Sequence, residues 1–284
     1  MIILKTIQQF QQHIQQQHNK NLTIGLVPTM GALHEGHLSL LKKCKHQCDI
    51  SICSIFVNPT QFNDVKDFEK YPITVENDII LLEKANCDIL FLPSKQEIYP
   101  EGTERNQPFE LGDIENILEG SFRPGHFQGV CQVVNRLLDI VQPHQLFLGQ
   151  KDYQQCMVLS KLLELTGKEK SIQINICPIL REPSGLALSS RNARLSEEEK
   201  QKAVAIYQSL QLIKQNINLL PISSLQKIVR LNLAKAGFEK IDYIAILQAQ
   251  TLEPVAEWDK RTPLIALIAA TLNGVRLIDN MKIN

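Results

Sequence analysis

Short apolar runs alternate with amphipathic stretches through the first two-thirds of this chain. The apolar runs predict buried strands at residues 22–27, 49–57, 88–92, 146–148 and 172–177. The stretches between them have helical spacing and predict helices at 36–47, 75–85, 130–141 and 153–166. Near the N-terminus, a glutamine-rich amphipathic surface helix is predicted by the helical spacing of Ile7, Phe10 and Ile14. Alternating strands and helices are typical of a parallel sheet with helices on both faces.

The pattern changes near residues 181–185, where proline and glycine indicate a loop or hinge. Downstream, Ser196 and Glu199 form a capping-box pattern that predicts the start of a helix. A second helix is predicted at 224–236, with Gly237 at its C-terminal cap. Strand-like runs follow at 241–247, 264–271 and 275–279. We therefore expect an α/β domain followed by a smaller α+β domain with an antiparallel sheet, at residues 1–182 and 183–284.

Composition excludes several classes of protein. The chain carries 30 basic and 30 acidic residues, and it has no long basic run, which disfavours a nucleic-acid partner. No apolar run approaches the ~20 residues needed to cross a bilayer, and the N-terminus lacks the apolar stretch of a signal peptide. The seven cysteines have no C-x-x-C spacing, so we expect buried, reduced thiols rather than disulfides.

The most informative segment is Pro28–His37, because it lies where a predicted strand turns into a predicted helix. A helix N-terminus offers free N–H groups and a positive dipole to phosphate. Gly31 and Gly36 let the backbone approach a ligand closely, and His34 and His37 can donate N–H bonds to phosphate oxygens. The segment therefore predicts a nucleoside triphosphate site.

Two other interpretations of this segment remain open. The zinc motif H-E-x-x-H places histidines four residues apart on one helix face, whereas His34 and His37 are three apart with a glycine between them. The histidines could also lie in an ordinary loop with no ligand.

Further candidate residues follow other predicted strands and the hinge. The neutral amides of Asn58 and Gln61 follow the second strand and can bind hydroxyls and carboxylates, although turn residues often have only a structural role. Lys151 supplies a point charge for phosphate, and Asp152 beside it could be only a helix N-cap. Gln155 lies one turn further on. In the hinge region, the residues that could clamp a triphosphate are Ser189, Ser190 and Arg191.

Six segments of the chain, taken together and in this order, form a highly specific sequence signature. They are PTMGALHEGH at 28–37, SIFVNPTQF at 54–62, Glu119-Gly120 with Arg123–Phe127, GQKDYQQ at 149–155, GLALSSRN at 185–192, and RLIDN at 276–280. In this combination the chain resembles the pantoate–β-alanine ligase (pantothenate synthetase) family along nearly its whole length. The first segment also resembles the HxGH signature of a wider nucleotidyltransferase superfamily that includes class I aminoacyl-tRNA synthetases.

The resemblance implies a Rossmann-like domain that binds ATP and pantoate, followed by a lid domain, in a cytoplasmic homodimer. It implies ATP as a substrate together with Mg²⁺. The implied ATP contacts are Met30, Gly31, Ala32, Leu33, His34, Glu35, Gly36, His37, Gly149, Gln150, Lys151, Asp152, Leu180, Leu188, Ser189, Ser190 and Arg191.

The resemblance also assigns roles to individual residues. Gln61 and Gln155 bind pantoate, with Asn58 at the same strand end, and Gln61 also binds β-alanine. His37 is the proton donor. In the family, a carboxylate that binds Mg²⁺ falls at the position of Asp78. This chain departs from the family pattern at two nearby positions. It has Asn77 where relatives often have a second acid, and Ile73 where they often have an arginine.

The implied reaction has two steps. The pantoate carboxylate attacks the α-phosphorus of ATP, giving pantoyl adenylate and pyrophosphate; the amine of β-alanine then attacks the acyl carbon and AMP leaves. A carboxylate is already anionic at neutral pH, so the first step needs positioning and charge neutralisation rather than a base. The residues expected to supply these are His34, His37, Lys151, Ser189, Ser190 and Arg191.

Three other functions are compatible with parts of this pattern. Another HxGH enzyme would transfer AMP to a phosphate acceptor and would lack the two glutamine positions. A synthetase-like RNA-binding protein is disfavoured by the neutral charge. A catalytically inactive nucleotide-binding protein would keep the nucleotide residues without the reaction.

Overall fold

A computed structural model describes residues 1–63, 68–104 and 107–284, which form two units, Met1–Pro178 and Ile179–Asn284. The sequence places the boundary four residues later, after Glu182. Arg181 accounts for the difference, because its guanidinium binds both carboxylate oxygens of Asp279 at 2.6 and 2.9 Å on the last strand of the second unit. The segment that resembles a hinge is therefore anchored to the second unit.

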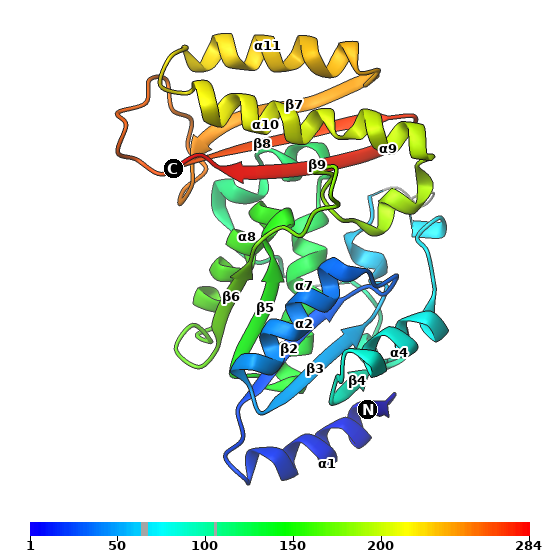
Figure 1. The fold of residues 1–284 in the computed structure, drawn as a ribbon. Helices are drawn as coiled ribbons and strands as arrows, with labels where there is room; N and C mark the ends of the chain where they lie inside the picture. The colour runs from blue at the N-terminus through cyan, green and yellow to red at the C-terminus, as the bar shows by residue number, and fades with distance from the viewer. Residues whose placement is uncertain (64–67, 105–106) are drawn as a thin grey trace. The chain divides into compact units, whose positions relative to one another are not determined.

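A six-stranded sheet in which every pair is parallel forms the centre of the first unit (Figure 1). Its strands are β1 (Ile2–Leu4), β2 (Ile24–Thr29), β3 (Ile50–Ile55), β4 (Ile89–Phe91), β5 (Gln145–Gly149) and β6 (Gln173–Cys177). The order β1-β4-β3-β2-β5-β6 changes direction at β2. The predicted strands and the parallel sheet are confirmed. The additional β1 has only three residues, too few for a periodic signal.

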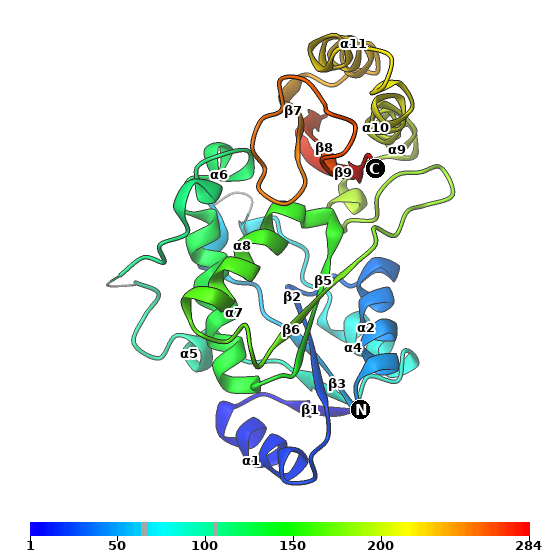
Figure 2. The same cartoon turned by 90° about the vertical axis from the view of Figure 1, so that its left-hand side faces the viewer.

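Helices cover both faces of this sheet, as Figure 2 shows, with α2 and α4 on one side and α7 and α8 on the other. Among the residues that the structure describes, the α-helices of this unit are α1 (Ile7–His18), α2 (Glu35–Gln47), α4 (Val75–Lys84), α5 (Lys95–Ile98), α6 (Glu119–Phe122), α7 (His126–Val141) and α8 (Tyr153–Leu165). Alternate strand residues enter opposite cores: Leu26 packs among the residues of α7 and α8, and Val27 packs against α2. Strand residues buried on both sides explain the continuous apolar runs.

The second unit contains an antiparallel sheet in the order β7-β8-β9, with α10 and α11 packed against it (Figure 1). Its elements are α9 (Glu197–Ala203), α10 (Ala205–Asn216), α11 (Ile222–Lys235), β7 (Lys240–Gln248), β8 (Leu264–Leu272) and β9 (Val275–Lys282). Both halves of the predicted capping box at Ser196 and Glu199 are present. The sequence did not predict α10, which follows α9 after a single residue, Val204.

Two predictions from composition can be compared with the described residues. All seven cysteines are buried, as expected, and none is in a disulfide in the structure. Within the described residues, no helix combines the length and apolar character needed to cross a membrane.

Candidate active site

The two histidines of the HxGH motif fix each other at the N-terminus of α2. His34 is the N-cap, and its Nδ1 accepts a hydrogen bond from the Gly36 N–H at 3.1 Å. The backbone N–H of His34 donates to Nδ1 of His37 at 3.4 Å, and the ring centroids are 4.1 Å apart. Because each Nδ1 is an acceptor, the proton of each neutral ring lies on Nε2, where it can be donated to a ligand.

Both imidazoles are neutral at physiological pH. Burial lowers the pKa of His34 to about 4, with a further lowering by the positive charge of Lys151. Burial also lowers the pKa of His37 to about 3, with smaller contributions from His34 and Lys151. The site therefore offers two fixed N–H donors without placing two positive charges beside each other.

The loop before these histidines has an unusual backbone. Gly31 has φ +81° and Ala32 has φ +49°, a region that disfavours alanine. The carboxylate of Asp78, on α4, accepts hydrogen bonds from the N–H groups of Ala32 at 3.0 Å and Leu33 at 2.8 Å. Asp78 therefore holds the loop in this conformation.

Lys151 lies in the short 3-10 helix Gln150–Asp152, between β5 and α8. Its charge acts on the pKa of both HxGH histidines, so the segments that follow β2 and β5 lie together at the switch point of the sheet. Ligands of open parallel sheets bind at this place. Asp152 occupies the N-cap position of α8 without making a side-chain cap bond, and its Oδ1 lies 3.8 Å from Lys151 Nζ. The simple N-cap interpretation of Asp152 is therefore not supported.

Gln61 and Asn58 lie just after β3, and both are buried, with Gln61 9% exposed. Asn58 is 1% exposed. Its Oδ1 accepts from the Tyr99 hydroxyl at 2.8 Å, and its Nδ2 donates to the Gly129 carbonyl at 3.0 Å and to Gln61 Oε1 at 3.3 Å. The predicted contact of Asn58 with pantoate would require one of these bonds to break. The side chain of Gln61 also approaches Met30, with Nε2 2.7 Å from Sδ.

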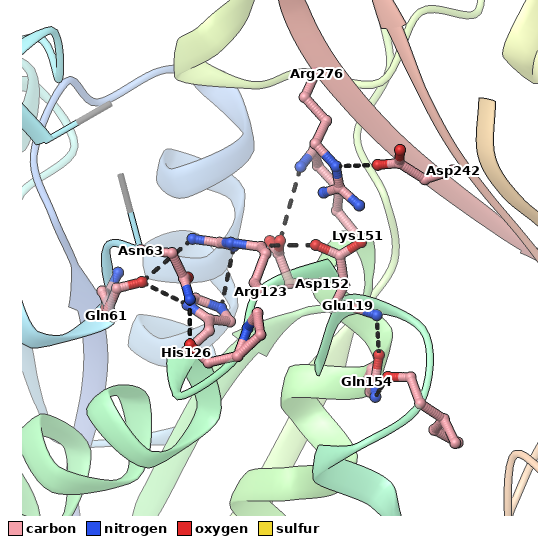
Figure 3. Close-up of polar contacts among 12 residues, drawn as sticks. Gln61, Asn63, Glu119, Arg123, His126, Lys151, Asp152, Gln154, Asp242 and Arg276 are labelled. Atoms are coloured by element: carbon pink, nitrogen blue, oxygen red, sulfur yellow. Dashed lines mark hydrogen bonds and ion pairs between the residues drawn. The ribbon is translucent and has the colours of Figure 1, made fainter. Parts of the chain in front are cut away.

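Arg123 and His126 hold the backbone of Gln61, as Figure 3 shows. His126 Nδ1 lies 2.7 Å from the Gln61 carbonyl oxygen, and the Arg123 guanidinium donates to the same oxygen at 3.3 Å. Arg123 also lies 3.1 Å from His126 Nε2. Burial, followed by the charge of Arg123, lowers the pKa of His126 to about 4. The neutral ring therefore donates to Gln61 through Nδ1 and accepts from Arg123 through Nε2.

Sequence reasoning gave Arg123 and His126 no role, although both lie in a segment that resembles the family. The sequence contained a signal in Gly129, one turn further along α7. A Cβ there would meet the carbonyl oxygen of Thr60 at 2.2 Å. The glycine thus lets α7 pack against the turn that carries Gln61.

Adjacent glutamines on α8 have different environments. Gln154 is 3% exposed, and its Oε1 accepts from the Glu119 N–H at 3.0 Å (Figure 3). Its Nε2 donates to the carbonyls of Ile114 and Ile117 at 2.7 and 2.8 Å. Gln154 therefore has a structural role in securing α6. Gln155 is partly exposed, which leaves it accessible to a ligand.

The remaining predicted ATP residues lie in the second unit and are brought together there. The N–H of Leu188 donates to the carbonyl of Leu180 at 3.0 Å, beside an antiparallel bridge between Arg181 and Ala187. Ser189 caps the 3-10 helix Ser190–Arg194 by accepting from the Arg191 N–H at 3.2 Å. The two separate segments that the sequence predicts to contact ATP thus form one local structure.

The described residues contain no group of three or more histidine, cysteine, aspartate or glutamate side chains that could hold a metal ion. Zinc between His34 and His37 is further disfavoured because the Nδ1 atom of each ring already accepts a backbone N–H. Asp78 is 0% exposed, and both its oxygens accept hydrogen bonds from the loop after β2. Its geometry does not fit a direct metal ligand.

Comparisons with known proteins agree along the whole chain. A model of the pantoate-beta-alanine ligase family matches residues 2–282. The pantothenate synthetase of Cytophaga hutchinsonii is 44% identical over 285 residues, which cover 100% of this chain and 99% of the relative. The corresponding protein of Thermotoga petrophila is 44% identical over 283 residues, covering 99% of both chains.

Solved structures give the same result. The crystal structure of the pantothenate synthetase from Thermus thermophilus has a TM-score of 0.91 and 34% identity, covering 100% of this chain and 99% of that one. The pantoate-beta-alanine ligase of Francisella tularensis, solved in complex with beta-gamma ATP and beta-alanine, has a TM-score of 0.81 and 40% identity. That comparison covers 99% of this chain and 97% of the other.

Proposed function

The chain belongs to the pantoate-beta-alanine ligase family, and we propose that it joins (R)-pantoate to β-alanine through a pantoyl-adenylate intermediate, consuming ATP and releasing AMP and pyrophosphate. The observation that carries this proposal is the arrangement of two neutral HxGH imidazoles beside Lys151, where the order of the parallel sheet reverses. The Francisella tularensis relative, solved in complex with beta-gamma ATP and beta-alanine, supports it.

In the first step, the pantoate carboxylate attacks the α-phosphorus of ATP and pyrophosphate leaves. Negative charge then grows on the phosphate oxygens, and fixed donors in a dry site stabilise it without reorganising. His34 and His37 supply Nε2–H donors, and Lys151 supplies the positive charge. His37 acts as a proton donor in the sense of a neutral hydrogen-bond donor, because a pKa of about 3 leaves no imidazolium at neutral pH.

The second unit contributes the remaining ATP contacts in this proposal, namely Leu180, Leu188, Ser189, Ser190 and Arg191. The hydroxyls and the guanidinium suit phosphate oxygens. Closure of this unit over the adenylate would exclude the water that hydrolyses it.

In the second step, the amine of β-alanine attacks the acyl carbon of pantoyl adenylate and AMP leaves. Gln61 contacts both pantoate and β-alanine in this proposal, and Gln155 contacts pantoate from α8. Two features of the structure support a positioning role around Gln61: its carbonyl is held by Arg123 and His126, and its side-chain oxygen accepts from Asn58.

We propose that magnesium binds with the phosphates of ATP. Mg²⁺ keeps several waters and is commonly held by substrate phosphates with one or two carboxylates, and it would offset phosphate charge when bound. A cytoplasmic homodimer is part of the same proposal. Seven free, buried cysteines are in keeping with a reducing compartment.

The test is ATP–pyrophosphate exchange with a panel of acids. We expect exchange that requires pantoate but not β-alanine, and pantothenate formation only when both are present. Exchange that proceeds equally without pantoate would refute the acyl-adenylate mechanism. ATP binding with neither exchange nor product would favour the inactive nucleotide-binding alternative, and AMP transfer to a phosphate acceptor would favour another HxGH enzyme.

A further inference from the structure

We propose that Asp78 is a positioning residue that sets the conformation of the ATP loop, and that it is not a magnesium ligand. This inference rests on the proposed function, because it assigns the loop after β2 to ATP. It changes the role that family resemblance gives to this carboxylate.

The carboxylate of Asp78 is placed as a hydrogen-bond acceptor for backbone amides. Its side chain is fully buried, with Oδ2 accepting from the Ala32 N–H at 3.0 Å and Oδ1 accepting from the Leu33 N–H at 2.8 Å. Oδ1 also accepts from the Thr74 hydroxyl at 3.1 Å. A Cβ on Gly31 would lie 3.0 Å from Oδ2, so the loop backbone passes directly over the carboxylate.

These bonds explain why the loop adopts a disfavoured conformation. Ala32 has φ +49° immediately after Gly31 at φ +81°, and an L-alanine adopts such a φ only where its surroundings impose it. A carboxylate forms stronger hydrogen bonds with N–H groups than a neutral acceptor does. With consecutive amides turned toward Asp78, the chain enters α2 at His34, whose backbone N–H then meets His37.

Direct magnesium ligation does not fit the same carboxylate. A cation would need an accessible oxygen, whereas the side chain is fully buried and both oxygens bind the loop. In the same turn of α4, Glu76 is an exposed carboxylate. Glu76 therefore provides a matched control for loss of one negative charge at this helix N-terminus.

The experiment compares wild type, Asp78→Asn and Glu76→Gln in three measurements. They are hydrogen exchange of the Ala32 and Leu33 amides without ligand, the KM for ATP in pantoate-dependent pyrophosphate exchange, and the Mg²⁺ concentration that gives half-maximal rate at saturating ATP. Asparagine keeps one acceptor oxygen, but its NH2 group faces the other loop N–H.

For Asp78→Asn we expect faster hydrogen exchange at both amides. We also expect the KM for ATP to rise about 5- to 100-fold, which is the usual cost of leaving a buried N–H without an acceptor. The Mg²⁺ requirement should not change, and Glu76→Gln should match wild type in all three measurements. If Asp78→Asn does not fold, Thr74→Val removes one donor to the carboxylate and should give a smaller change in the same direction.

Two outcomes overturn the proposal. One is unchanged amide exchange and unchanged KM for ATP in a folded Asp78→Asn protein, or in Thr74→Val if only that variant folds. The other is a higher Mg²⁺ requirement with normal amide exchange, which identifies a metal ligand. Failure of the proposed function is distinct, because wild type itself would then show no pantoate-dependent exchange.

Discussion

Replacing His126 by glutamine should make the stability of the protein less sensitive to acid. His126 is buried as a neutral ring that lies between the Gln61 carbonyl and the Arg123 guanidinium. A proton added to the ring would go to Nε2, which faces that positive charge. Glutamine can replace both hydrogen bonds but does not titrate.

The direction follows from proton counting. The pKa of His126 is lowered from 6.5 in the unfolded chain to about 4 in the folded protein. Between these values the unfolded state binds more protons, so stability is lost as pH falls from 6.5 toward 4. At pH 5.0, about 1.5 units below the unfolded pKa, the loss attributable to this ring is about 2 kcal/mol.

The assay is urea unfolding followed by circular dichroism at pH 7.5 and pH 5.0. Between pH 7.5 and pH 5.0, the free energy of unfolding of His126→Gln should fall by about 2 kcal/mol less than that of wild type. His46→Gln, an exposed position on α2, controls for removal of one imidazole. The single tryptophan, Trp258, lies in the second unit, so its fluorescence separates the unfolding of that unit.

This reasoning would be refuted if wild type and His126→Gln differed in free energy of unfolding by the same amount at both pH values. It would mean that the folded ring takes up a proton as readily as an unfolded one, and that the geometry around Nε2 does not oppose protonation.

Other perturbations test the remaining parts of the site. Lys151→Ala should slow single-turnover adenylation about 10²- to 10³-fold without a comparable loss of stability, since one charged donor is removed; a near wild-type rate in the folded variant would contradict its role. Gln61→Ala and Gln155→Ala should raise the pantoate requirement in pyrophosphate exchange by an amount equivalent to about 1–3 kcal/mol, and a collapse of calorimetric ATP affinity would instead place these residues in the nucleotide site. Hydrogen exchange across residues 181–191 should slow when ATP and Mg²⁺ are added, and unchanged protection at saturating nucleotide would argue against a lid. Dithiothreitol should leave activity and melting temperature unaltered, because all seven cysteines are free and buried; a large loss would reveal a functional disulfide.

Local sequence patterns determined the order and type of most elements. Apolar runs mark the buried parallel strands, and the capping box at Ser196 and Glu199 marks a helix start, because both signals involve residues close together in the chain. The HxGH segment could likewise be predicted to be a phosphate site from its position between a strand and a helix. Such signals do not depend on which distant segment packs nearby.

The tertiary structure decided what individual side chains are available to do. Asn58 and Gln61 are both amides at one strand end, yet Asn58 is bound by Tyr99 and Gly129 from elsewhere in the chain. Asp78 meets Ala32 across 46 positions of sequence. No periodicity encodes such pairings, because they arise from the order of strands in the sheet.

The protonation of the histidines also depends on the folded protein. His34, His37 and His126 would all titrate near 6.5 in an unfolded chain, and burial with a neighbouring Lys151 or Arg123 keeps them neutral. The sequence by itself supplied the imidazoles and the motif that contains two of them. Their charge and the ring nitrogen that carries the proton were decided only by folding, because desolvation and hydrogen-bond partners exist only once distant segments pack together.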